Sequence, residues 1–181
     1  MKRIVLGYSG GLATTVAIPW LAEKHGAEVV AVTLDLGQGG ELEAIRDRAL
    51  AAGAVRAHVL DVRDGFGREY VTPSLLAGAL SRSSTIAALE TPLIAKTLVE
   101  ILAIEQASAV AHCAGASGSR ALANALGVLS PATTIVTPAT DWHMTPDEQI
   151  EYAARHNAVG INSAVEIQAV DGRFSHAIGV D

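Results

Sequence analysis

A short apolar run, Arg3–Gly7, ends in the segment Tyr8-Ser9-Gly10-Gly11-Leu12 and then passes into a helical pattern. Two adjacent glycines let the chain turn tightly and bring its backbone N–H groups close to an anion. The following helix directs its unpaired amide donors and the positive end of its dipole at the same point. The segment therefore predicts a strand, a tight turn and a helix, and we interpret the turn as an ATP phosphate site. On Ser-Gly-Gly alone, an ordinary strand-to-helix turn that uses its glycines only for tightness is an equally good interpretation.

The spacing of the residues excludes three commoner motifs at this turn. Gly7, Gly10 and Gly11 do not fit the dinucleotide pattern G-x-G-x-x-G, and no Gly-Lys-Ser/Thr follows as in a Walker loop. Ser9 is not placed as a hydrolase nucleophile, because G-x-S-x-G is absent and no base is evident.

The rest of the chain repeats the alternation of strand and helix. Apolar and β-branched runs predict strands, and apolar spacing of three and four predicts helices. We expect strands at 4–7, 28–35, 57–61, 109–113 and 133–136, and helices from the turn to Gly26, at 41–52, at 64–80 in two pieces broken near Thr72-Pro73, from Thr91-Pro92 to 106, at 120–129 and at 145–156. This rhythm of βαβ units predicts an α/β fold: an open doubly wound parallel sheet of about five strands with helices on both faces.

In such sheets ligands bind beyond the carboxyl ends of the strands, where the strand order reverses. A second glycine-rich loop, residues 36–40, follows the second predicted strand, and a third loop of small residues, 114–119, follows the fourth. Because the first two loops both lie at carboxyl ends, we favour a nucleotide site over an ordinary turn. Near the end of the chain, Asp171-Gly172 in an alternating segment predicts a C-terminal hairpin.

Composition narrows the class of protein. The 181 residues are 50% hydrophobic and 18% charged, which predicts one domain, residues 1–181, with apolar surface left for a homo-oligomer contact. A net charge of -6 without a basic cluster argues against a nucleic-acid partner. Cys113 is the only cysteine, so no intrachain disulfide forms, and no segment is typical of a signal peptide or a membrane span. We therefore expect a cytoplasmic protein.

Other candidate ligand groups give weaker signals. The six histidines have no metal-ligand spacing, and we expect them to be solvated or singly hydrogen-bonded; they are His25, His58, His112, His143, His156 and His176. Asp35 and Asp61 stand at strand ends, where either could hold Mg²⁺ through water or serve equally well in a turn or helix cap.

Four segments resemble, in order, the N-terminal nucleotide-binding domain of the argininosuccinate synthase family. They are Ser9-Gly-Gly-Leu-Ala-Thr-Thr15, Thr33-Leu-Asp-Leu-Gly-Gln-Gly39, Pro92-Leu-Ile-Ala-Lys96 with Leu98-Val-Glu100, and Asp141-Trp142 through Glu151-Tyr152-Ala153. This family belongs to the N-type ATP pyrophosphatases, whose phosphate loop reads S-G-G-x-D-S or close to it. The resemblance implies an adenine nucleotide alpha hydrolase-like fold and ATP with Mg²⁺. It also implies the family's chemistry, in which citrulline is adenylated with release of pyrophosphate and the amine of aspartate then displaces AMP.

The resemblance also implies roles for individual residues. The phosphates would be cradled by Ser9, Gly10, Gly11, Thr14 and Thr15, the adenosine would be flanked by Tyr8 and Leu34 with Gln38 nearby, and Gly115 would line the opposite loop.

Four departures from the family pattern bear on catalysis. The acid of the phosphate loop is Ala13 here, and a methyl group cannot help to hold Mg²⁺. The loop Ala114–Ser119 lacks the family's lysine and acid, and Ser81–Thr91 replaces the citrulline region. The printed sequence stops where the family continues into a second domain that completes the site and the tetramer. We therefore expect adenine-nucleotide binding with impaired ligation of citrulline and aspartate; the alternative is a non-catalytic nucleotide-binding module or regulator.

Overall fold

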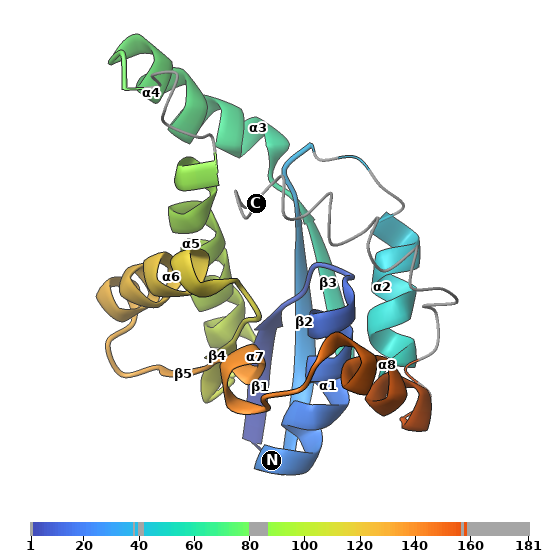
Figure 1. Cartoon of the computed structure of the whole chain (residues 1–181). Helices are drawn as coiled ribbons and strands as arrows, with labels where there is room; N and C mark the ends of the chain where they lie inside the picture. The colour runs from blue at the N-terminus through green and yellow to red at the C-terminus, as the bar shows by residue number, and fades with distance from the viewer. Residues whose placement is uncertain (1, 38, 40–41, 80–86, 157, 159–181) are drawn as a thin grey trace.

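The computed structural model describes residues 2–37, 39, 42–79, 87–156 and 158. Five parallel strands form one sheet in the order β3-β2-β1-β4-β5 (Figure 1). Their bounds are Lys2–Gly7 for β1, Ala27–Asp35 for β2, Arg56–Asp61 for β3, Ala109–Ala111 for β4 and Thr134–Val136 for β5. The strand order reverses between β1 and β4, so this is the predicted open doubly wound sheet, and the predicted fold class is confirmed.

Helices cover both faces of the sheet. The elements between and after the strands are α1 (Leu12–His25), α2 (Leu42–Ala51), α3 (Arg63–Phe66), the π-helix η1 (Gly67–Val71), α4 (Thr72–Leu76), α5 (Ala87–Ile104), α6 (Ala116–Leu129), α7 (Pro138–Asp141) and α8 (Pro146–Arg155). One core contains residues of α1, α2 and α8, and the other contains residues of α5 and α6. The segment α3–η1–α4 extends away from the body of the domain (Figure 1).

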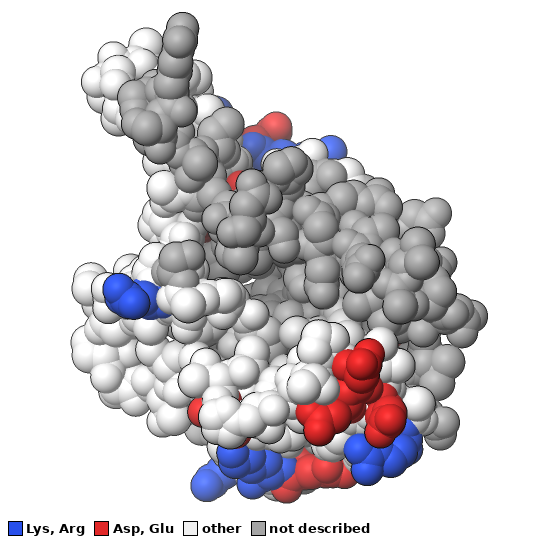
Figure 2. All heavy atoms as spheres, viewed as in Figure 1, with Lys and Arg blue, Asp and Glu red and all other residues white. Residues whose placement is uncertain are grey.

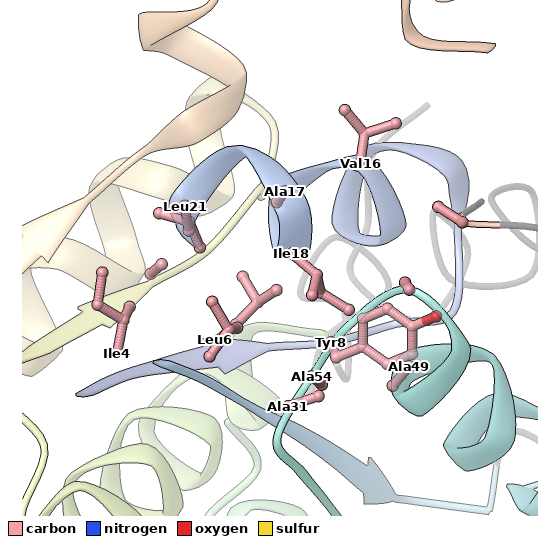
Figure 3. Packing of buried hydrophobic residues seen from close by; sticks show 14 of the residues in the cluster. Ile4, Leu6, Tyr8, Val16, Ala17, Ile18, Leu21, Ala31, Ala49 and Ala54 are labelled. Atoms are coloured by element: carbon pink, nitrogen blue, oxygen red, sulfur yellow. The ribbon is translucent and has the colours of Figure 1, made fainter. Parts of the chain in front are cut away.

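The sequence of β1 is continuously apolar because the strand is buried on both faces. Ile4 and Leu6 point into the core under α1, and Val5 points into the core under α5. Figure 3 shows Ile4 and Leu6 facing Ile18 and Leu21 of α1. A strand buried on both faces has no solvent side on which to place polar residues.

Two helix ends at the predicted positions have well-defined capping geometry. Gly26 ends α1 in the left-handed region, with φ of 56°. At the start of α8, Thr145 and Glu148 form both hydrogen bonds of a capping box.

Three predicted boundaries are wrong. At Thr72 the helix changes from the π form of η1 to the α form of α4, and both Val71 and Thr72 keep helical backbone angles, so the predicted break near Thr72-Pro73 is a change of helix type and not an interruption. Thr91 does not cap α5, which begins at Ala87 and keeps Pro92 inside. Proline's fixed φ suits a helix, so its cost there is one missing hydrogen bond and local crowding. The third boundary concerns α6, which begins at Ala116 and not at residue 120.

One further expectation, the C-terminal hairpin around Asp171-Gly172, concerns residues outside those that the structure describes. Within the described ranges, none of the helices combines the length and hydropathy needed to cross a bilayer. Figure 2 shows acidic and basic side chains side by side along the lower edge of the face in view, so these described residues present a mixed charge.

Candidate functional site

The turn after β1 is held in place by its own side chains. Gly10 has φ of +82°, a conformation that favours glycine. The Ser9 hydroxyl accepts a hydrogen bond from the backbone N–H of Gly11 at 3.3 Å and shares a hydrogen bond of 3.1 Å with the Thr14 hydroxyl. Thr14 donates in turn to the carbonyl of Gly11 at 3.1 Å. The predicted phosphate residues Ser9, Gly10, Gly11 and Thr14 therefore form one compact turn.

Thr15 and Tyr8 lie on the core side of this turn and stabilise it. The Thr15 hydroxyl, which is fully buried, donates to the Gly11 carbonyl at 2.8 Å and lies 3.0 Å from the Tyr8 hydroxyl. Figure 3 shows the Tyr8 ring inside the core beside Ala49 of α2. Burial raises the pKa of Tyr8 to about 12, against the opposing effects of the Thr15 hydrogen bond and the charge of Arg48, so the phenol stays neutral. Both side chains thus form hydrogen bonds within the protein and hold the turn from its core side.

Arg48 of α2 lies directly against the turn. Its Nη1 donates a hydrogen bond of 2.7 Å to the carbonyl of Gly10. A Cβ on Gly10 would lie 3.2 Å from Cγ1 of Ile45 and 3.4 Å from Nη1 of Arg48. Arg48 was not predicted as a site residue, and no local spacing pointed to it, because 38 residues separate it from Gly10.

The helices α1 and α6 begin in the same way. Gly11 and Gly115 are their N-cap residues, both with extended backbone and neither with a side chain that caps the helix. Neither helix has an acidic residue in its first turn. Each N-terminus therefore leaves backbone N–H groups and a partial positive charge for an anion.

A cavity of about 110 Å³ opens between these two turns. Its walls come from the ends of β1, β2 and β4 and from α5 and α6, and its lining residues include Ser9, Thr14, Leu34, Leu36, Ile94, Leu98, His112, Cys113, Ala114 and Leu122. Because β1 and β4 flank the reversal in strand order, the cavity lies where ligands bind in open α/β sheets. The predicted residues Tyr8 and Leu34 both line it, while Gly115 is adjacent to the lining residue Ala114, and Gln38 is outside the described residues.

His112 is the most unusual polar group of the cavity. It follows β4, is 3% exposed, and neither of its ring nitrogens has a hydrogen-bond partner among the described residues. Burial lowers the pKa of His112 to about 4, so its imidazole is neutral near pH 7. The expectation of a solvated or singly bonded histidine is therefore wrong for this residue.

The two strand-end aspartates are occupied by turn contacts. Asp35 Oδ1 accepts a hydrogen bond from the Gly37 N–H at 2.9 Å, and Asp61 Oδ1 accepts one from Nε of Arg63 at 2.9 Å. The hydrogen bonds of Arg63 lower the pKa of Asp61 to about 2. No group of three or more histidine, cysteine, aspartate or glutamate residues forms a metal site within the part of the chain that the structure describes.

Comparison with known proteins decides the family. The family profile for the arginosuccinate synthase N-terminal HUP domain matches residues 3–159. The chain belongs to the argininosuccinate synthase family. It is 42% identical over 159 residues to the argininosuccinate synthase of Oceanobacillus iheyensis, a match that covers 86% of this chain and 38% of that protein. It is also 42% identical over 158 residues to the enzyme of Geobacillus thermodenitrificans, covering 85% of this chain and 39% of that protein.

The chain thus spans about two fifths of the length of these argininosuccinate synthases. Two solved structures share the fold at low identity. A U34-tRNA thiolase from Methanococcus maripaludis is 13% identical with a TM-score of 0.54, covering 99% of this chain and 70% of that one. A predicted tRNA methyltransferase subunit from Methanocaldococcus jannaschii is 15% identical with a TM-score of 0.52, covering 85% of this chain and 75% of that one. Membership of the argininosuccinate synthase family places the chain among the ATP-utilising PP-loop proteins.

Proposed function

We propose that this chain binds ATP with its phosphates at the Ser-Gly-Gly turn and its adenosine in the adjoining cavity. One observation carries the proposal: α1 and α6, both begun by glycine without a side-chain cap, start beside the same apolar cavity, which is lined by Thr14 in the first turn of α1 and by Ala114 next to the N-cap of α6. The uncapped amides suit oxygen anions, and the apolar walls suit the faces of a purine ring. The family assignment supports the same ligand.

Within this proposal the residues in and around the turn have separate roles. Backbone N–H groups of Gly10 and Leu12 face the phosphates, while the Gly11 N–H and the hydroxyls of Ser9 and Thr14 hold the turn in its observed shape. Arg48 adds a guanidinium beside Gly10, where it offsets part of the negative charge of the triphosphate. Leu34 and Leu36 supply one wall of the adenosine half.

We further propose that ligation of citrulline with aspartate, the chemistry suggested by the family, is impaired in this chain. Two features of the described structure support this. Ala13 places a methyl group where the family's loop carries an acid, and Ala114–Ser119 runs into the first turn of α6 without the lysine or acid of the family's pattern. The same features favour the second candidate, a non-catalytic adenine-nucleotide-binding module.

Two assays test these proposals in turn. Calorimetric titration with ATP, ADP and AMP, with and without Mg²⁺, should show saturable binding that is tightest for ATP. The absence of binding at millimolar nucleotide would contradict every nucleotide proposal. A pyrophosphate-release assay with ATP, citrulline and aspartate should then show no turnover, and clear turnover would instead establish the ligase.

The remaining expectations stay proposals about the whole molecule: a single domain, a cytoplasmic location, no nucleic-acid partner and a homo-oligomer. Exposed leucines and valine support self-association, since Leu76 of α4 is 85% exposed and Val128 of α6 is 81% exposed. Light scattering coupled to gel filtration should give a mass above 18.7 kDa, and a monomer at high concentration would overturn the oligomer.

A further inference from the structure

We propose that His112 is the residue through which the cavity recognises the nucleoside half of its ligand, by hydrogen bonding to a polar edge of the sugar or base. The inference rests on the proposed nucleotide site and assigns a specificity-determining residue within it.

The burial of His112 is the first observation. The side chain is 3% exposed, and both Nδ1 and Nε2 lack a hydrogen-bond partner among the described residues. Buried polar groups in proteins are nearly always hydrogen-bonded, and an unpaired one weakens the folded state. The backbone of His112 does not share this property, because its N–H donates to the carbonyl of Val136 at 3.2 Å. The missing hydrogen bonds of His112 are therefore those of its imidazole ring.

The composition of the cavity is the second observation. Near His112 its walls are apolar, formed by side chains such as Leu34, Ile94, Leu98 and Leu122. The polar side chains of the opposite wall are already used, because Ser9 and Thr14 hydrogen-bond to each other and to Gly11. A flat ring with apolar faces and a polar edge fills such a space, and His112 is then the side chain left to meet that edge.

The chemistry of the ring selects the part of the nucleotide. A neutral imidazole offers one N–H donor and one nitrogen acceptor. A ribose hydroxyl, or the amino group and ring nitrogen of adenine, both donates and accepts and so matches it. A phosphate is a pure acceptor that favours a cation, and burial keeps His112 neutral near pH 7. The phosphates accordingly belong to the two helix N-termini, and His112 belongs to the nucleoside.

The test separates this role from a structural one by measuring stability and affinity together. In His112→Phe the unpaired polar ring is replaced by an apolar ring of similar size. We expect this variant to melt at or above the temperature of the natural chain, and to bind adenosine, AMP and ATP more weakly by the same factor, about tenfold. His112→Asn, which keeps a donor and an acceptor, should recover part of the affinity. His25→Phe, on an exposed histidine at the end of α1, should bind as the natural chain does.

Two analogues identify the edge that is recognised. If His112 meets the sugar, the natural chain discriminates against 2′-deoxyadenosine and His112→Phe does not; if it meets the base, the same holds for inosine. His112→Phe with unchanged affinity for all three ligands, or with both discriminations intact, would overturn the inference while leaving the nucleotide site in place. A natural chain that binds none of the ligands would instead contradict the proposed function itself.

Discussion

Arg48 and Gly10 are joined by a hydrogen bond of 2.7 Å from the guanidinium to the backbone carbonyl, which places a cation of α2 on the turn after β1. The contribution of such a cation to the binding free energy of a nucleotide grows with the negative charge of the nucleotide. Arg48→Gln should therefore weaken ATP binding by about tenfold and AMP binding by less, as measured by calorimetry at low salt.

The matched control for Arg48 is its neighbour Arg46. Arg46 lies on the same helix, is exposed and pairs with Asp47 at 3.6 Å, so Arg46→Gln should leave both affinities unchanged. An equal loss for ATP, AMP and adenosine in Arg48→Gln would mean that Arg48 only supports the shape of the turn.

Gly10 supplies a second test, because its conformation and its surroundings both exclude a side chain. Its φ is +82° and an added Cβ would press on Ile45, so Gly10→Ala should lose ATP binding. Gly53→Ala is the control, since Gly53 has φ of +103° but nothing within 4 Å of an added Cβ. The conformational cost of each change is about 1–2 kcal/mol, so both variants should melt earlier while only Gly10→Ala loses the nucleotide.

Ala13 gives a prediction of gained function. A carboxylate at this position, in the first turn of α1, suits the positive end of the helix and adds an oxygen ligand beside the phosphates. Ala13→Asp should make ATP affinity depend more strongly on Mg²⁺ than it does in the natural chain, as measured by titrations in EDTA and in excess Mg²⁺. An equal dependence of ATP affinity on Mg²⁺ in the two proteins would show that the missing acid does not limit Mg²⁺ binding at this turn.

Glu105 links β1 and β3 near the amino ends of these strands, at the end of the sheet opposite the cavity. Its carboxylate is buried and accepts hydrogen bonds of 2.8 Å from both Arg56 and His58, with Arg3 at 3.4 Å. Burial alone would raise the pKa of Glu105, but the bonds from His58 and Arg56 together hold it below its ordinary value. Glu105→Gln should lower the unfolding free energy by about 1–2 kcal/mol at pH 7, because both arginines are partly solvated.

The pH dependence follows from the direction of this shift. An acid whose pKa is lower in the folded protein contributes stability above its unfolded pKa and loses it as the pH falls through its folded pKa. The deficit of Glu105→Gln in urea denaturation should therefore shrink below about pH 4. Asp47→Asn, which removes an exposed ion pair, should show no deficit at either pH.

Glu90 predicts the opposite dependence. Its side chain is 6% exposed, its Oε2 has no partner among the described residues, and burial raises its pKa from 4.5 to about 7. The folded state therefore binds the extra proton between these two values, and stability falls as the pH rises across them. Glu90→Gln should raise the melting temperature by about 2–6 °C at pH 8 and leave it unchanged at pH 4.5. An equal rise at both values would rule out titration of Glu90 as the cause.

The strands and the tight glycine turn after β1 were predictable because their signals are local. A buried parallel strand is apolar on both faces, and Ser-Gly-Gly combines tight turning with exposed amides within three residues. Helix starts at Ala87 and Ala116 were not predicted, because Thr91-Pro92 has the form of a helix start and the glycines of 114–119 have the form of a loop. Arg48 and the unpaired ring of His112 depend on packing between distant segments, which no periodicity records.

The central claim is that backbone amides after β1 bind the phosphates of a nucleotide, and amide resonances report on this directly. In ¹H–¹⁵N spectra of the labelled chain, inorganic pyrophosphate and ATP should each shift the amide signals of Gly10, Gly11 and Leu12 saturably, and adenosine should leave these three in place. Binding of ATP without any movement of these signals would contradict the account.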